Sequence, residues 1–317
     1  MVGCRLQVFD IRGNLVWHSS SPSHPYPHVE ASGGYLATSQ DEGNLFVIYR
    51  RSDITSPPSQ LSQDQLNRLR DLARTEPEHL TPYQPFALID PGCVCLAAKL
   101  RMPFFAAVAA GQTNVFVFNL LDATRQTVDI SALGDPDGLA DNRINYVELL
   151  GDHVLLAGSH SISAWHRAKG TVGLFPPKSP SVVINASPAL QANAPGFWRN
   201  YGRRPAKWSA VHHDGLNLVA VSHGTRLPPD GRLLWTHQPG HAEDGSMAVR
   251  PEKTATLRLH ATCVQLAVEN GRAVVVTVHA DLFCGLWLVD LADGATDGRL
   301  RPSAPVSVAC CSAASRT

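Results

Sequence analysis

The sequence predicts an all-β protein built from repeated strand pairs, and three observations support this class. The 317 residues include 24 glycines and 23 prolines, a composition that suits many short strands joined by turns. Short runs rich in Val, Leu, Phe and Trp recur in pairs, and turn residues bound each pair. Only one segment carries a convincing helical pattern. A chain of this length is long enough to form one large all-β domain.

The strand pairs share a plan in which a β-run, a turn and a second β-run follow one another. The clearest pair is HVLLAGSHSISAWHRAKG at 153–170. The same plan occurs at 33–51, 104–123, 214–236 and 270–294, and a hairpin at 5–17 is counted with the first of these. Apolar runs at 144–150 and 261–268 add a third strand to their units. Because a blade of three or four strands cannot bury both of its faces alone, the pattern predicts a β-propeller of about five to seven blades.

The segment 57–80 predicts one short helical insertion. It carries four leucines near helical spacing, which are Leu61, Leu66, Leu69 and Leu72. Ser62 is a suitable N-cap, and Pro77 is a stop signal. We expect these leucines to cover a side of the propeller, with a partner-binding helix as the alternative.

The remaining boundaries follow from composition. Residues 175–207 are rich in Pro, Ala and Ser, and they predict a loop insertion. We expect a single propeller domain over 1–300 and a flexible tail over 301–317.

Composition and charge argue against several classes of protein. With 27 basic and 27 acidic residues the chain is formally neutral, which argues against coating nucleic acid or an anionic membrane. The start MVGCRLQVFD lacks the pattern of a signal peptide, and the longest apolar run, 102–111, is about half of a membrane span. Seven irregularly spaced cysteines suit reduced thiols. We therefore expect a cytoplasmic or nuclear protein with no membrane partner.

The segment GDHVLLAGSHSISAW resembles the middle of a WD40 repeat. Asp152 corresponds to the turn Asp, 156–159 to the strand end and Trp165 to the Trp of the Trp-Asp pair. His166 stands where the Asp is expected, and the opening Gly-His pair is missing, so the repeat is degenerate. Similar degenerate units occur near Asp41, Asp214 and Asp290. The resemblance implies a WD40-like propeller that acts as a protein-interaction scaffold.

The degenerate units with their insertions are similar in texture to the propellers of fungal F-box and related WD40-like proteins. That resemblance implies a substrate-recognition role in an F-box-type ubiquitin ligase adaptor. The stretches DIRGNLVW at 10–17 and DGRLLW at 230–235 instead resemble strands of quinoprotein-like propellers. The alternative function is therefore a propeller enzyme, a hydrolase or quinoprotein-like, with its site at the central channel.

The sequence contains no motif of an enzyme active site. It has no G-x-S-x-G elbow, no phosphate-cradling Gly loop and no dinucleotide fingerprint. His212 and His213 are adjacent on an expected strand, so we expect their side chains to point to opposite faces. Cys93 and Cys95 share a strand face but lack a second pair nearby, so we expect them to pack in the core. We predict no catalytic residues, no metal site and no cofactor.

The clearest asymmetry of charge lies between His153 and His213. This stretch has no Asp or Glu and seven cations, which are Arg167, Lys169, Lys178, Arg199, Arg203, Arg204 and Lys207. Its densest part is GFWRNYGRRPAKW at 196–208. Arg forks match carboxylates and phosphates, and exposed aromatics supply rigid contact area.

The dense part of this stretch is the predicted partner-binding site. It consists of Trp198, Arg199, Tyr201, Arg203, Arg204, Lys207 and Trp208. We expect an acidic or phosphorylated protein partner, with nucleic acid as the less favoured alternative. The opposing reading is a solvated loop whose aromatics lie under the neighbouring blade.

Overall fold

The structure, a computed structural model, describes much of the chain. The described residues are 6–18, 28–40, 45–55, 62–64, 67, 82–110, 114–129, 144–158, 162–170, 172–175, 182–185, 208–222, 231–241, 247–248, 254–259, 262–278, 284–291, 301–302 and 306–308. The chain forms two compact units, Met1–Ala132 and Leu133–Thr317, and each is described by itself. Among the described residues, no helix has the length and apolar character needed to cross a membrane.

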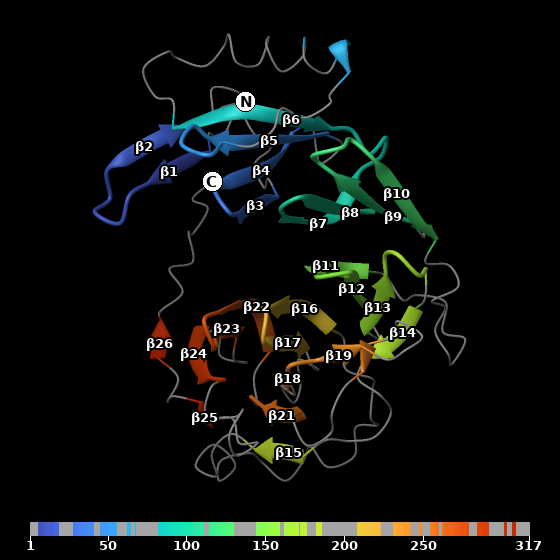
Figure 1. Cartoon of the computed structure of the whole chain (residues 1–317). Helices are drawn as coiled ribbons and strands as arrows, with labels where there is room; N and C mark the ends of the chain where they lie inside the picture. Colours follow the sequence, from blue (N-terminus) through green and yellow to red (C-terminus); the bar gives the residue numbers. More distant parts are fainter. Residues whose placement is uncertain are drawn as a thin grey trace, which may run out of the picture. The chain divides into compact units, whose positions relative to one another are not determined.

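The first unit contains two four-stranded antiparallel sheets and a two-stranded ribbon (Figure 1). One sheet consists of β3 (Val29–Ser32), β4 (Tyr35–Gln40), β5 (Leu45–Arg51) and β6 (Tyr83–Ile89). The other consists of β7 (Cys95–Arg101), β8 (Phe104–Ala109), β9 (Asn114–Asn119) and β10 (Arg125–Asp129). The ribbon consists of β1 (Gln7–Phe9) and β2 (Leu15–His18).

The second unit contains three larger sheets and a short ribbon. The first sheet has β11 (Ile144–Leu150), β12 (His153–Gly158), β13 (Ile162–His166) and β14 (Val172–Phe175). The second has β16 (Trp208–His213), β17 (Asn217–Ser222), β18 (Arg232–His237), β21 (Thr254–Arg258) and β15 (Val182–Asn185), in that order. The third has β22 (Thr262–Glu269), β23 (Arg272–Val278) and β24 (Cys284–Asp290), with β25 (Arg301–Pro302) and β26 (Val306–Val308) both paired to β24. The ribbon has β19 (Gly240–His241) and β20 (Met247–Ala248).

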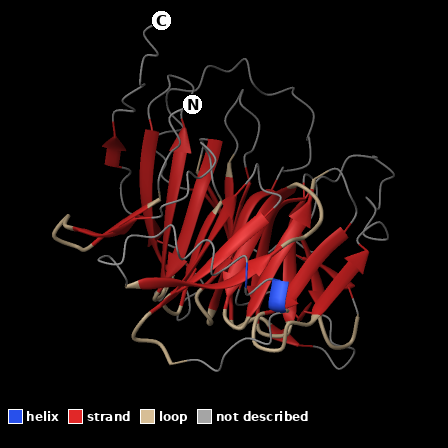
Figure 2. Ribbon diagram, turned by 90° about the horizontal axis from the view of Figure 1, so that it is seen from above, coloured by secondary structure: helices blue, strands red, loops and turns tan. Residues whose placement is uncertain are grey.

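The predicted all-β class is confirmed, because strands dominate the described residues (Figure 2). Of the 57–80 insertion, the described residues Gln63, Asp64 and Asn67 are helical. Its four leucines and most of the 175–207 insertion lie outside the described residues. Two short strands in the expected tail, β25 and β26, pair with β24. The single domain over 1–300 and the flexibility of the rest of the tail stay predictions.

A repeated β-bulge marks equivalent strands in four sheets. It lies near the start of one edge strand of each sheet, which we call the first strand. There the register to the neighbouring strand shifts by one residue. The shifts follow Cys95 in β7, Ile144 in β11, Trp208 in β16 and Cys263 in β22. Bulges strengthen the local twist of a strand, and their repetition at one position agrees with the repeated plan of the sequence.

Sheet β3–β6 in the first unit is buried on both faces. Phe46 of β5 packs against Phe105 of β8, with ring centroids 4.9 Å apart. On the other face, Trp17 of β2 lies against Tyr49, with centroids 5.0 Å apart. The run LFVIY in β5 is continuously apolar because both of its faces are covered. The hairpin 5–17, which the sequence analysis counted with the first unit, is therefore a separate ribbon stacked on that sheet.

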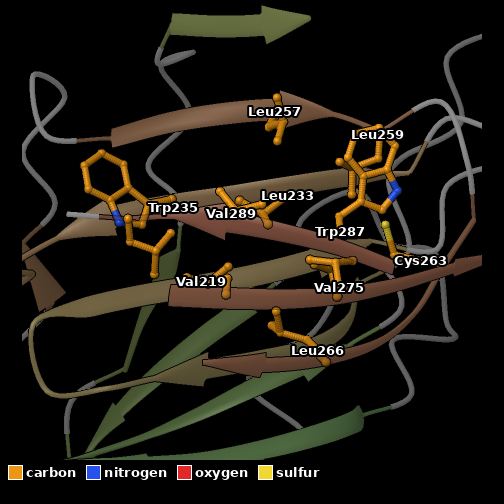
Figure 3. Packing of buried hydrophobic residues seen from close by; sticks show 14 residues of the cluster. Val219, Leu233, Trp235, Leu257, Leu259, Cys263, Leu266, Val275, Trp287 and Val289 are labelled. Atoms are coloured by element: carbon orange, nitrogen blue, oxygen red, sulfur yellow. The ribbon is translucent and has the colours of Figure 1, made fainter. Parts of the chain in front are cut away.

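Neighbouring sheets of the second unit stack in the same way. Val219, Leu233 and Trp235 of the second sheet face Val275 and Trp287 of the third sheet in one buried cluster. Figure 3 shows the two tryptophans at opposite ends of this cluster, with the aliphatic side chains between them. Full burial of such side chains contributes about 1.5–3 kcal/mol each before entropy is counted.

One buried polar contact links adjacent strands of the third sheet. The indole Nε1–H of Trp287 donates to Thr277 Oγ1 at 3.1 Å, and both residues are buried. By the repeated bulge, Ser222 in the second sheet is equivalent to Thr277, since each pairs with the residue at the bulge. The position that matches Trp287 there is occupied by Leu234. The repeats therefore share a backbone plan without sharing this contact.

Asp214 connects the second sheet to the third at the turn between β16 and β17. Its carboxylate accepts backbone N–H bonds from Leu216 and Asn217, and from Gly271 of the next sheet at 2.7 Å. Burial opposes ionisation of this carboxyl group. The hydrogen bonds from Asn217, Gly271 and Leu216 outweigh that penalty and hold the pKa of Asp214 below its ordinary value.

We expect Thr277→Val to lower the free energy of unfolding by about 1–3 kcal/mol, because it preserves shape but leaves a buried indole N–H without an acceptor. Urea denaturation measures this change. In the double variant with Trp287→Phe, the donor is also removed, so the total loss should be smaller than the sum of the two single losses. Strictly additive losses would contradict the assigned contact.

We expect Asp214→Asn to destabilise the protein by about 1 kcal/mol at neutral pH, since the amide replaces a partly solvated carboxylate that accepts several N–H bonds. The folded pKa is lowered, so the carboxylate's stabilisation is complete above the unfolded pKa and is lost as pH falls through the folded pKa. Unfolding curves below about pH 4 should therefore depend less on pH in the variant. Asp152→Asn, at an exposed carboxylate 3.5 Å from Arg167, is the matched control and should change little.

Candidate functional site

Most of the predicted partner-binding site lies outside the described residues. This applies to Trp198, Arg199, Tyr201, Arg203, Arg204 and Lys207. The structure describes the backbone of Trp208, which is the first residue of β16. The two strands that flank the connection 186–207, β15 and β16, have a described backbone.

The strand register places the last residue of β15 and the first residue of β16 in one row of the second sheet. Trp208 pairs with Ser222, Ser222 with Arg232, Arg232 with Arg258, and Arg258 with Asn185. The row runs across all five strands of the sheet, from β16 at one edge to β15 at the other. Asn185 ends β15 and Trp208 begins β16. The connection 186–207 thus leaves and rejoins the sheet at the same end, across a width of about 19 Å.

Two arginines that sequence analysis missed belong to this row. Arg232 begins β18 and Arg258 ends β21, so both lie at the sheet end where β15 finishes and β16 begins. They are distant from the basic stretch in sequence, and only the register brings them to it. Arginine is a residue type that binds carboxylates and phosphates through paired hydrogen bonds, so these two backbone positions are further candidates for the predicted site. The opposite end of β16 carries the Asp214 turn.

A second candidate is a cluster of ionisable side chains between the first two sheets of the second unit. Glu148 of β11 is buried, and its Oε2 lies 3.4 Å from Nδ1 of His212 on β16. Its Oε1 lies 4.0 Å from Nε2 of His213 and accepts the Leu149 N–H at 2.9 Å. The phenol of Tyr146 lies 2.5 Å from Nε2 of His212. Carboxylate, imidazole and phenol therefore form one chain.

His213 is held in one tautomer by its contacts. Its Nε2 lies 2.6 Å from the Leu149 carbonyl, which can only accept a hydrogen bond. Its Nδ1 accepts the backbone N–H of Gly215 at 3.1 Å. Nε2 therefore carries the proton, and the neutral ring has both nitrogens occupied. His213 thus ties β16 to β11 and is closed to other ligands.

The two adjacent histidines do not diverge as fully as sequence analysis expected. Both approach Glu148, because this residue comes from the neighbouring sheet and presents one carboxylate oxygen to each ring. Sequence spacing gave no signal of this, since Glu148 lies far from them along the chain. Within the described part of the chain, no group of three or more His, Cys, Asp or Glu side chains is arranged to hold a metal ion.

The first unit has a comparable ion pair between the first strands of its sheets. Lys99 Nζ of β7 lies 3.2 Å from Glu30 Oε2 of β3. Burial raises the pKa of Glu30, and the nearby ammonium only partly offsets that effect. In both units the first strands of neighbouring sheets are thus joined by ionisable side chains.

The cysteine pair is structural in its surroundings. Cys95 is buried in the core of the first unit, and Cys93 packs partly against that core. Burial, reinforced by the neighbouring thiol of Cys93, raises the pKa of Cys95 to about 12. The Cys95 thiol therefore stays protonated at neutral pH, as expected for a packing residue rather than a reactive one.

Comparison of the sequence with known protein families and with curated proteins finds no match. Comparison of the structure does find similar proteins. The β-propeller domain of Cps50 (Swd1) from Myceliophteria thermophila has a TM-score of 0.57 at 9% identity, over 96% of this chain and 80% of that chain. Apo AztD from Citrobacter koseri has a TM-score of 0.52 at 11% identity, over 96% and 78%. Hsv2 from Kluyveromyces lactis has a TM-score of 0.50 at 11% identity, over 95% and 80%.

These likenesses extend over nearly the whole chain at very low sequence identity. They agree with the repeated antiparallel sheets, the repeated bulge and the stacked apolar faces described above. The predicted fold is confirmed: the chain has a β-propeller fold, and the degenerate repeat pattern of its sequence is consistent with it.

Proposed function

We propose that the chain is a non-enzymatic protein-interaction scaffold, and that it binds its partner through the basic, aromatic segment 198–208. The observation that carries this proposal is the row from Trp208 to Asn185. Its register brings Arg232 and Arg258 to the sheet end at which the segment rejoins the sheet. Loops on a rigid β-scaffold are a common place for recognition.

The ionisable side chains of the scaffold support the same proposal. Glu148 is closed in by two histidines and a backbone N–H, His213 uses both ring nitrogens, and Asp214 is occupied by turn amides. These side chains make contacts that hold neighbouring sheets together. A hydrolase at a propeller channel would instead require carboxylates that face a substrate.

The finer proposal concerns the partner and its context. The dense cations of the segment suit an acidic or phosphorylated protein, because guanidinium forks match both groups. We further propose, from the texture of the repeats, that the propeller recognises substrates for an F-box-type ubiquitin ligase. Co-purification of the ligase's adaptor and cullin subunits would support this step. If these subunits do not co-purify, the scaffold proposal still holds, with another partner.

We expect simultaneous reversal of Arg199, Arg203, Arg204 and Lys207 to Glu to abolish recovery of the native partner in affinity purification, because the partner would meet like charge. Arg258→Glu alone should weaken recovery, since it lies in the same row. Reversal of Arg12 and Arg125, exposed cations outside the basic stretch, is the control and should leave recovery unchanged.

Unchanged recovery of the partner with all four charges reversed would contradict the assignment of the site. Binding that disappears after nuclease treatment would assign the segment to nucleic acid instead. Treatment with a phosphatase separates a phosphorylated partner from an acidic one, because only the phosphorylated partner should then be lost.

We expect Glu148→Gln to lower the free energy of unfolding by about 1–3 kcal/mol and to leave partner recovery intact, because the cluster joins two sheets and does not touch the partner. Tyr146→Phe, which removes only the phenol hydroxyl, should cost about 1 kcal/mol. Thermal and urea unfolding measure both losses. A Glu148→Gln protein as stable as the wild type, but lacking a hydrolytic activity that the wild type shows, would favour the enzyme alternative.

A further inference from the structure

Two arginines occupy directly opposite positions on adjacent antiparallel strands of the second sheet. Arg232 begins β18 and pairs with Arg258, which ends β21. Residues paired in this way share one face of the sheet, and their Cβ atoms lie about 4.5–5.5 Å apart. Like charges at such positions destabilise a strand pair, so the arrangement needs a compensating negative charge.

The other residues of this row are of types that donate hydrogen bonds. In order across the sheet, the row consists of Trp208, Ser222, Arg232, Arg258 and Asn185. Indole, hydroxyl, guanidinium and carboxamide groups all carry a donor, and none of these five residues is acidic. The composition of the row therefore suits an anion with several acceptor oxygens.

The third sheet indicates that the scaffold does not require charges in this row. Its row with the same relation to the bulge consists of Cys263, Thr277, Gly285 and Ser307. Gly285 and Ser307 stand where the second sheet has Arg232 and Arg258, and neither is charged. The two arginines are therefore an addition to the repeated plan, at positions where their repulsion opposes folding.

The sequence offers few acidic residues of its own to compensate the pair. The stretch 153–213, which includes β15 and β16, has no Asp or Glu. The acidic residues nearest in sequence to the two arginines are Asp230 and Glu252, and both lie outside the described residues. These two carboxylates are the alternative to a bound anion, and the experiments below separate the two cases.

A phosphate monoester suits two adjacent arginines better than a carboxylate does. It carries a charge of about −1.5 to −2 at pH 7 and has three oxygens that accept hydrogen bonds. One such group can therefore compensate two guanidinium groups and accept hydrogen bonds from both. A carboxylate carries a single charge, so it would leave one of the two cations uncompensated.

We propose that Arg232 and Arg258 together bind one phosphate group, and that this group belongs to a phosphorylated side chain of the protein partner. The inference rests on the proposed function, because it states which chemical group of the partner is recognised at this end of the sheet. It selects a phosphorylated partner over one that is acidic without phosphate.

Titration of the full chain with inorganic phosphate, by calorimetry at constant ionic strength, tests the site without the partner. We expect the double variant Arg232→Gln with Arg258→Gln to bind phosphate about tenfold or more weakly than the wild type. Arg258→Lys keeps the charge but loses the paired hydrogen bonds, so it should weaken binding by less. Arg12→Gln with Arg125→Gln removes two exposed charges elsewhere, and this matched control should bind phosphate like the wild type.

Thermal unfolding adds a result of opposite sign. Without phosphate, the double glutamine variant should unfold at the same temperature as the wild type or a higher one, because the repulsive pair is removed. With phosphate, the wild type should gain thermal stability and the variant should not. Arg258→Lys repeats both measurements if the double variant fails to fold by circular dichroism.

Three results would overturn the proposal. The first is equal phosphate binding by the wild type and the folded double glutamine variant. The second is a double variant that is less stable without phosphate, with a similar loss in Asp230→Asn or Glu252→Gln, because the chain would then compensate the pair itself. The third is recovery of the native partner that survives both phosphatase treatment and the loss of both arginines.

The failure of this proposal can be told apart from the failure of the proposed function. In the third result, loss of the partner on reversal of Arg199, Arg203, Arg204 and Lys207 would still assign binding to the basic segment. Recovery that is sensitive to phosphatase and needs both Arg232 and Arg258, but survives that reversal, would support the phosphate site and contradict the role of the segment.

Discussion

Stacking of apolar sheet faces is the interaction on which the rest of this structure depends. Each sheet has few, short strands and cannot bury two faces alone, so its stability comes from the neighbouring sheet. Examples are Phe46 against Phe105 in the first unit and the cluster that contains both Trp235 and Trp287 in the second. The same requirement explains why strands such as β5 are apolar on both faces.

Apolar stacking is non-directional, so it does not by itself fix how one sheet sits on the next. Directional contacts supply that information in each unit. His213 binds the Leu149 carbonyl, Asp214 binds the Gly271 amide, and Lys99 pairs with Glu30. Every one of these contacts joins two sheets, and each lies on a first strand or in the turn that follows one. These ionisable residues therefore join neighbouring sheets and fix their relative position.

The strand pairs were predictable from sequence because hairpins are local. The pair at 153–170 became β12 and β13, and that at 270–294 became β23 and β24. Turn chemistry contributes to this, as at Asn270 and Gly271, which both have positive φ in a two-residue turn. Side-chain contacts between strands and between sheets were not predictable. The Thr277–Trp287 bond, the Glu148 cluster and the row containing Arg232 and Arg258 all join residues whose separation along the chain carries no signal.

The two ends of the second sheet differ in a way that bears on where a partner can bind. At the Asp214 end the backbone turns within a few residues, and its amides are occupied by that carboxylate and by the next sheet. A short, internally bonded turn has little free surface to offer. At the other end β15 finishes and β16 begins, in a row of the sheet that contains two arginines. The connection between these two strands, 186–207, contains the densest basic and aromatic sequence in the chain. This end of the sheet is therefore the one to which the proposed function assigns partner binding.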